Sequence, residues 1–209
     1  DSSAQPSLFY KSESIERRPL LVGLHTWSFD RFNQVDDMLP YAKKYDFNLL
    51  LPDFRGSNLI TNPNCTQACG SLYAKQDIKD AIDYVIANEN VDSENIFLLG
   101  LSGGGHMSLL MAGFSPEYFK AIGAYVPITD LEKWTKQNKN YCKNYRNDTK
   151  KYGLINCNEE FLIGKNRYVI LKSKSGRNDS GPIFKKRINN SCYKRNKKPD
   201  DNTGHHDIC

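Results

Sequence analysis

Short apolar runs alternate with amphipathic segments as far as Thr129, and this alternation is the feature that most restricts the fold. Four runs have the length and continuity of strands buried on both faces, at residues 20–24, 47–51, 95–99 and 121–126. Three segments between them carry apolar residues at helical spacing, at residues 34–45, 76–87 and 102–113. Strands that alternate with helices predict a mostly parallel sheet with helices on both faces, joined by right-handed crossovers. We therefore expect an α/β fold.

The pattern weakens after Thr129. Residues 131–151 are polar and rich in Tyr, Lys and Asn, which suits a surface helix and loop over the strand ends. A fifth parallel strand is predicted at residues 168–171 and a further helix at 183–190. A final strand is expected before the C-terminus, but residues 196–203 contain no apolar side chain. The length of 209 residues predicts a single domain over residues 1–209.

Charge and hydropathy argue against two classes of partner. The net charge of +5 is concentrated in residues 165–200, where twelve Lys or Arg face two Asp. This stretch lacks interleaved aromatic residues and any nucleic-acid-binding motif, so we interpret it as a solvated basic surface and expect no nucleic acid partner. Apolar runs stay well below the roughly 18 residues of a membrane span, so no membrane partner is expected. Residues 1–5 lack a signal-peptide pattern, which leaves the compartment open.

The cysteine pattern does not indicate a metal site. The chain has six cysteines, at positions 65, 69, 142, 157, 192 and 209. Cys65 and Cys69 lie four residues apart, but no second close pair follows, so we predict no zinc site. An even number of cysteines permits disulfides, as in a periplasmic or secreted protein. The sequence leaves their pairing open, and nothing in it indicates a cofactor.

The segment Gly100-Leu101-Ser102-Gly103-Gly104 fits the G-x-S-x-G turn that carries a nucleophilic serine. An apolar run leads directly into the turn and a helical segment leads directly out. Such a turn places the serine in a strained conformation at the top of the sheet, and flanking glycines allow strand and helix to approach closely. A phosphate-binding turn is the alternative, but neither a G-x-G-x-x-G pattern nor a Walker lysine is present. We therefore predict Ser102 as the nucleophile.

Several segments resemble one branch of a known superfamily. The chain between Pro19 and Trp134 is similar to the single-domain esterases and peptidase-like enzymes of the α/β hydrolases, which are related to the catalytic domain of prolyl oligopeptidase. The matching segments follow the family's order and spacing, at residues 24–27, 52–58, 76–81, 100–105 and 126–131. The resemblance implies an acid after the next strand and a catalytic histidine near the C-terminus.

The loop after the first strand is expected to supply half of an oxyanion hole. In this fold that loop contributes one backbone N–H, and the residue after the nucleophile contributes the other. Trp27 and Gly103 are therefore the predicted donors. His25, at the end of the first strand, is predicted to orient this loop rather than to act as the catalytic base.

The resemblance also suggests the two remaining members of a triad. Asp179 follows the predicted fifth strand in a segment that resembles the family's G-x-x-D-x-x-V-P turn, with Gly181 in place of valine. The segment Gly204-His205-His206-Asp207-Ile208 resembles the G-G-H-(D/E)-I ending of the family, which places the base at His206. His205 is the base if the residue directly after glycine is the one matched. In a further alignment Asp207 is the acid and the chain has no base.

These residues predict a serine hydrolase that cleaves small or sugar-linked carboxylic esters without metal or cofactor. The expectation of an open single domain, and the lack of an evident acidic pair for a substrate amine, favour esters. An aminopeptidase or dipeptidyl-type peptidase acting on short peptides is one alternative. A non-catalytic binding protein with a degraded C-terminus is the other. The sequence does not indicate an oligomeric state.

Overall fold

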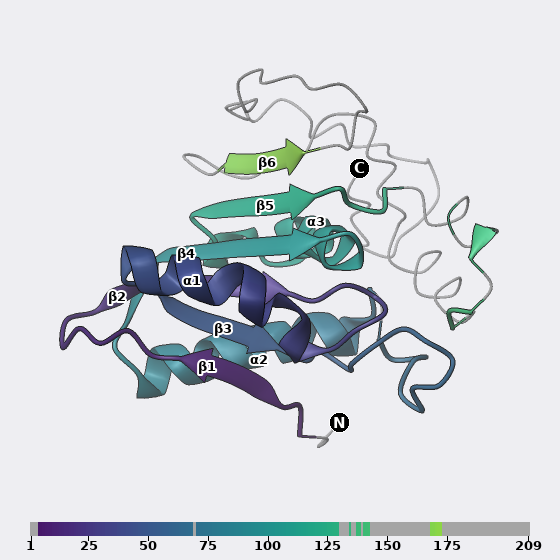
Figure 1. Cartoon of the computed structure of the whole chain (residues 1–209), viewed down its shortest axis with the longest axis horizontal. Coiled ribbons are helices and arrows are strands. Elements are labelled where there is room, and N and C mark those ends of the chain that lie inside the picture. Colours follow the sequence, from purple (N-terminus) through teal and green to yellow (C-terminus); the bar gives the residue numbers. More distant parts are fainter. Residues whose placement is uncertain are drawn as a thin grey trace, which may run out of the picture.

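A computed structural model describes residues 4–68, 70–129, 134, 137, 138, 140–142 and 168–172 (Figure 1). Its six-stranded sheet has the order β1-β3-β2-β4-β5-β6. The strands are β1 (Ser7–Tyr10), β2 (Arg18–Leu24), β3 (Asn48–Pro52), β4 (Val91–Leu101), β5 (Ala121–Tyr125) and β6 (Tyr168–Lys172). The helices are α1 (Val35–Tyr45), α2 (Leu72–Asn88) and α3 (Gly103–Phe114), with short 3₁₀ helices at Arg31–Gln34 and Pro116–Tyr118.

All five predicted strands and the three helices predicted before Thr129 are confirmed. The edge strand β1 was not predicted; it pairs antiparallel with β3, whereas the other neighbouring strands are parallel. The helix predicted from residue 76 begins earlier, at Leu72, because the hydroxyl of Ser71 accepts a hydrogen bond from the N–H of Ala74 and caps the helix. The fold is thus the mostly parallel α/β sheet that the sequence predicted.

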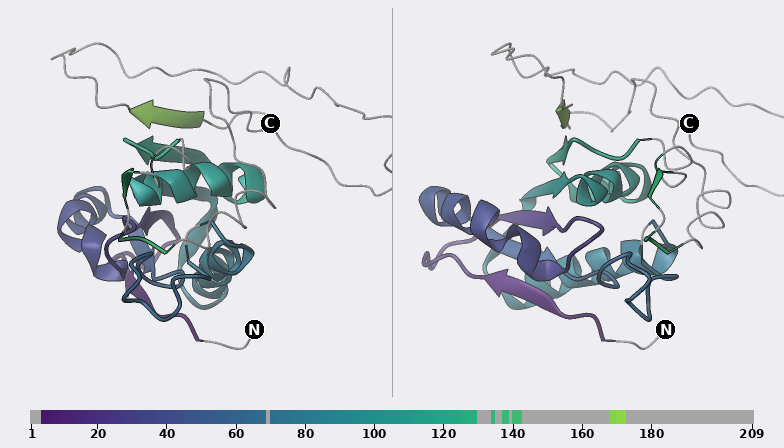
Figure 2. Two further views of the ribbon diagram at one scale, coloured as in Figure 1. Left: turned by 90° about the vertical axis from the view of Figure 1, so that its right-hand side faces the viewer. Right: turned by 45° about the vertical axis from the view of Figure 1, so that its right-hand side comes forward.

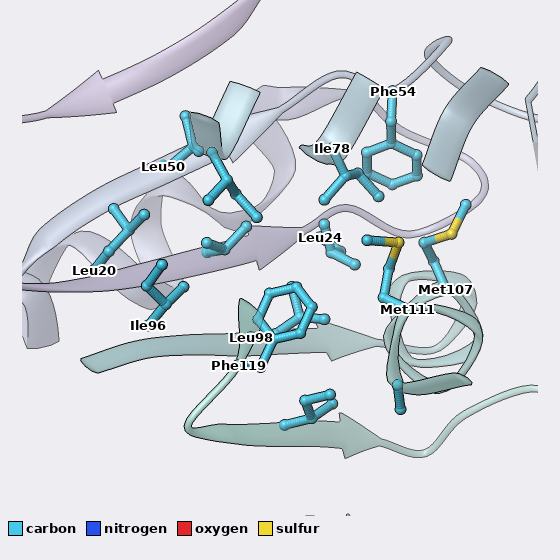
Figure 3. Close-up of a cluster of buried hydrophobic side chains, with 14 of the residues drawn as sticks. Leu20, Leu24, Leu50, Phe54, Ile78, Ile96, Leu98, Met107, Met111 and Phe119 are labelled. Atoms are coloured by element: carbon cyan, nitrogen blue, oxygen red, sulfur yellow. The ribbon is translucent and has the colours of Figure 1, made fainter. Parts of the chain in front are cut away.

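Helices cover both faces of the sheet (Figure 2). On one face, α2 and α3 pack over alternate residues of β2 and β4, and Ile78 of α2 and Met107 of α3 join Leu24 in the main core (Figure 3). On the other face, Met38 of α1 packs against Leu51 of β3 in a second core. The two cores follow from the two-residue period of strands, which sends successive side chains to opposite faces.

Parallel pairing brings the functional loops to one edge of the sheet. Leu24, the last residue of β2, pairs with Gly100 in β4, and Leu101 pairs with Tyr125, the last residue of β5. The loops that follow these strands therefore meet at the carboxyl edge of the sheet, which is where ligands bind in α/β folds.

Several predicted segments lie outside the described residues. They include most of residues 131–151, the predicted helix at 183–190 and the expected last strand before the C-terminus. Among the helices that the structure does describe, none is both long enough and apolar enough to cross a bilayer.

Candidate functional site

Ser102 occupies the sharp turn between β4 and α3. Its backbone dihedral angles are φ 53° and ψ −111°, a positive φ that is unusual for a residue with a side chain. Hydrogen bonds from both sides stabilise this conformation: the N–H of Ser102 donates to the carbonyl of Tyr125 at 2.9 Å, and its carbonyl accepts from the N–H of His106 at 3.0 Å. Strain of this kind is typical of functional turns, where the surrounding structure holds the backbone in place.

Two glycines allow the turn to be this tight. A Cβ atom on Gly100 would lie 2.1 Å from the carbonyl oxygen of Gly104. A Cβ atom on Gly104 would lie 2.1 Å from the carbonyl oxygen of Leu24, in the neighbouring strand. Both obstacles are main-chain atoms, which cannot rotate away. The role predicted for these glycines, to let strand and helix approach closely, is therefore confirmed.

Trp27 and Gly103 lie in direct contact beside Ser102. A Cβ atom on Gly103 would be 2.7 Å from the backbone nitrogen of Trp27 and 2.2 Å from Cδ1 of its indole ring. Gly103 is also the first residue of α3. At this end of a helix the backbone N–H groups have no acceptor within the helix, and the helix dipole places a positive partial charge there. The structure thus brings the two predicted oxyanion-hole residues together beside Ser102, the predicted nucleophile.

The loop that carries Trp27 is fixed by hydrogen bonds from its main chain to its surroundings. The carbonyl of Trp27 accepts from the N–H of Asn58 at 2.8 Å, and the N–H of Thr26 donates to Oδ1 of Asn33 at 3.0 Å. Because two separate segments bind this loop, its backbone is held in one position before any substrate arrives. Such preorganisation is what stabilisation of a developing charge requires.

His25 has the structural role that was predicted for it. Its Nδ1 lies 2.8 Å from the carbonyl oxygen of Thr26, and its Nε2 lies 2.9 Å from that of Asp53. The ring also stacks on Phe54 at a centroid distance of 4.0 Å, and burial lowers the pKa of the imidazole. Both ring nitrogens face main-chain carbonyls, so His25 is not placed to take a proton from Ser102.

His106 lies one helical turn after Ser102 and was missed by sequence reasoning. Its Nδ1 is 2.8 Å from the carbonyl oxygen of Ile128, and its ring meets Trp27 edge-on at 5.7 Å. Its Nε2 is buried and has no hydrogen-bond partner among the described residues. Burial lowers the pKa of His106 to about 4, so the ring is neutral at physiological pH. The signal in the sequence that could have identified His106 as a buried residue was its position within the apolar segment that forms α3.

Aromatic side chains pack around the same loop. The indole of Trp134 meets that of Trp27 at 5.0 Å, and the ring of Tyr141 meets Trp134 at 4.7 Å. The hydroxyl of Tyr141 is 2.6 Å from the hydroxyl of Ser28. A segment more than a hundred residues distant in sequence therefore packs against the loop that carries Trp27.

A polar cavity of about 430 Å³ is lined in part by residues that follow Trp27. Ser28, Phe29, Asp30, Asp53 and Arg55 belong to its lining, whereas Ser102, Trp27 and Gly103 do not. The cavity is thus separate from the predicted nucleophile.

The remaining predicted site residues lie outside the described residues. They are Asp179, His205, His206 and Asp207. In the described part of the chain, no cluster of three or more His, Cys, Asp or Glu side chains is arranged to hold a metal ion.

Comparison with known proteins identifies a family and several relatives of this chain. Residues 33–160 match the prolyl oligopeptidase family. The acylamino-acid-releasing enzyme 2 of Oryza sativa is 25% identical over 140 residues, which are 63% of this chain and 18% of that protein. The acetylxylan esterase of Coprinopsis cinerea is 28% identical over 123 residues, which are 54% of this chain and 32% of the esterase. The chain therefore spans no more than about a third of these relatives.

A solved structure shows the same fold. The acylaminoacyl peptidase of Pyrococcus horikoshii superposes with a TM-score of 0.54 and 20% sequence identity, over 82% of this chain and 35% of the peptidase. The family match covers the Ser102 turn and more than half of the sequence. The chain belongs to the prolyl oligopeptidase family and has the α/β-hydrolase fold.

Proposed function

We propose that this protein is a serine hydrolase that cleaves carboxylic esters through an acyl-enzyme on Ser102. The observation that carries the proposal is the positive-φ turn at Ser102, with Trp27 and Gly103 in contact beside it. This turn lies at the positive end of α3, where negative charge on a reacting oxygen is stabilised.

The proposed reaction proceeds in two halves. The hydroxyl of Ser102 attacks the acyl carbon while His206 takes its proton, and Asp179 orients the imidazole. The backbone N–H groups of Trp27 and Gly103 bind the oxygen that becomes negatively charged. The alcohol leaves with the proton from His206, and water then releases the acid from Ser102 by the same steps. Neither metal nor cofactor takes part in this scheme.

Leaving-group chemistry and one relative favour esters. An amine must be protonated by the general acid before it can leave, whereas an activated alcohol such as nitrophenol leaves with less help. Ester cleavage therefore makes a smaller demand on the histidine. The acetylxylan esterase relative supports a small ester substrate.

Cleavage of an acylated amino acid from a peptide is the second candidate. The match to acylamino-acid-releasing enzymes and to the prolyl oligopeptidase family favours it. Such a substrate has no free amine, so it does not require the acidic pair that an aminopeptidase would use.

A fluorophosphonate probe tests the proposed nucleophile. We expect the probe to form an adduct on Ser102, identified by peptide mass spectrometry, and the Ser102→Ala variant to lose at least about a thousandfold in kcat. Ser108→Ala is the matched control: Ser108 is a buried serine of the same helix whose hydroxyl donates to the carbonyl of Gly104, and its loss should leave labelling intact. A protein that stays unlabelled, or labels at another residue, would be a binding protein or use another nucleophile.

A substrate panel then separates the two candidates. We expect p-nitrophenyl acetate and butyrate to turn over faster than N-acetyl-alanine p-nitroanilide, with all activity lost in Ser102→Ala. Faster turnover of the acylated anilide would assign the peptidase function. Turnover of unacylated alanine p-nitroanilide would point instead to an aminopeptidase.

A further inference from the structure

Cys65 and Cys142 lie side by side although 76 residues separate them in the sequence. Cys65 is part of the loop between β3 and α2, and Cys142 ends the described segment 140–142. The two thiols are neighbours, close enough for Cys142 to raise the pKa of Cys65, and both are free in the structure. Cys142 is buried, with 7% of its surface exposed, whereas Cys65 is partly exposed.

Main-chain pairing holds the two segments in this register. Leu59 and Tyr141 form an antiparallel bridge. The N–H of Cys142 donates to the carbonyl of Asn58 at 2.9 Å, and the N–H of Ile60 donates to the carbonyl of Asn140 at 3.3 Å. This pairing brings the backbone of Cys142 against the segment that leads to Cys65, whose own N–H donates to the carbonyl of Asn62 at 3.0 Å.

The same register places Tyr141 against the loop next to the nucleophile. Tyr141 directly precedes Cys142, and its hydroxyl lies 2.6 Å from that of Ser28. A covalent bond at Cys142 would fix the backbone next to this contact. It would thereby hold the aromatic cluster formed by Trp27, Trp134 and Tyr141.

We propose that Cys65 and Cys142 are a modification site at which a disulfide forms and joins the segment of Tyr141 to the loop between β3 and α2. This bond would hold Tyr141 in its contact with Ser28, in the loop that carries Trp27. The formation of this bond is independent of the proposed function. Only its effect on turnover rests on that function.

The oxidant is a small-molecule disulfide such as glutathione disulfide. The more accessible thiolate of Cys65 attacks one sulfur of glutathione disulfide, which releases one glutathione thiolate and leaves a mixed disulfide. The thiolate of Cys142 then attacks the Cys65 sulfur and releases the second glutathione. Two protein thiols are oxidised and one glutathione disulfide is reduced to two glutathione molecules, so atoms and electrons balance.

Exchange should be slow at neutral pH, because burial and the neighbouring Cys142 raise the pKa of Cys65 to about 11. Equilibration is therefore best carried out at about pH 8.5, where the thiolate fraction is larger than at neutral pH.

The test equilibrates the full chain with glutathione disulfide and maps its peptides without reduction. We expect a linked peptide that joins Cys65 to Cys142, and a Tm roughly 5–15 °C above that of the reduced protein. Cys65→Ser and Cys142→Ser should each abolish both the linked peptide and the increase in Tm. The variant Cys69→Ser is the control and should retain both.

Two results would overturn the proposal. One is that Cys65 and Cys142 are both still alkylated by iodoacetamide after equilibration. The other is that Cys65 is linked to a different cysteine while Cys142 stays free. Peptide mapping reads both outcomes without an activity assay, so failure of the proposed hydrolase function does not affect the test. If the protein is active on p-nitrophenyl acetate, reduction should lower kcat in the wild type and leave Cys142→Ser unchanged.

Discussion

The guanidinium of Arg55 and the carboxylate of Asp77 form a buried, two-point ion pair, with Nε 2.7 Å from Oδ2 and Nη2 3.0 Å from Oδ1. Their side chains are 4% and 9% exposed. Arg55 directly follows Phe54, whose ring stacks on His25. The pair thereby anchors the loop after β3 to α2, and this loop supports the one that carries Trp27.

Removal of one partner of this ion pair should strongly lower the stability of the folded protein. We expect Arg55→Ala to lower the free energy of unfolding by about 3–5 kcal/mol, because the carboxylate of Asp77 would remain buried without its counter-charge. Urea denaturation followed by circular dichroism measures the change. The half-exposed pair of Lys11 and Glu89, 2.9 Å apart, is the control, and Lys11→Ala should cost no more than about 1 kcal/mol. Equal losses in the two variants would contradict the role assigned to burial.

The close approach of β2 to Gly104 of α3 should make the addition of a single methyl group at this position destabilising. We expect Gly104→Ala to cost about 3 kcal/mol or more and to abolish fluorophosphonate labelling, because the added Cβ would meet the main-chain carbonyl of Leu24. Gly123→Ala is the control, since the close neighbour of its Cβ would be the end of the flexible side chain of Leu99, at 2.6 Å, whereas the carbonyl oxygen of Leu98 would lie at an ordinary contact distance of 3.7 Å. That variant should retain fluorophosphonate labelling, and its free energy of unfolding should fall by less than about 1 kcal/mol. A tolerated Gly104→Ala would show that strand and helix have room to separate.

The C-terminal histidines should differ in their effect on turnover. We expect His206→Ala and Asp179→Asn each to lower kcat on p-nitrophenyl acetate by about a thousandfold or more, because members of a triad act as a unit. His205→Ala should stay close to wild type, and circular dichroism should show that Asp179→Asn is folded. A loss confined to His205→Ala would move the base by one residue. If neither histidine affects turnover, the base lies elsewhere in the chain.

Burial of His106 should make the protein less stable in mild acid. The pKa of His106 is lowered from 6.5 to about 4 by burial, so the unfolded chain takes up a proton at a pH where the folded protein does not. The stability that the neutral, buried His106 ring contributes is therefore complete above pH 6.5. As the pH falls towards 4, the free energy of unfolding should decrease by on the order of 2–3 kcal/mol. Urea denaturation between pH 4.5 and 7.5 measures this slope.

The variant His106→Gln is the matched comparison for this effect. It removes the titrating group but keeps a side-chain N–H donor for the carbonyl of Ile128. The slope of its unfolding free energy against pH should be smaller than that of the wild type. An unchanged slope would assign the acid sensitivity to other groups, such as His25, whose pKa is also lowered by burial.

The sequence by itself determined the order of the strands and α-helices between residue 20 and Thr129, and the position of the turn at Ser102. Continuous apolar runs have few alternatives to buried strands, and helical spacing identifies the segments between them. The serine turn is readable because strand, Gly-x-Ser-x-Gly and helix are adjacent in the chain, so no long-range information is needed. The edge strand β1 was missed because its short sequence, Ser7–Tyr10, forms a strand only through pairing with β3.

Only the tertiary structure decided which distant segments meet at this turn. The contact of Trp27 with Gly103 arises because β2 and β4 are neighbours in the sheet, which no local pattern encodes. His106 was missed because its burial depends on packing against Trp27 and Ile128, from two other segments. The approach of residues 140–142 to residues 58–60 likewise depends on main-chain hydrogen bonds between segments that are far apart in the chain. Periodicity reports which face of an element is buried, whereas long-range packing selects what that face touches.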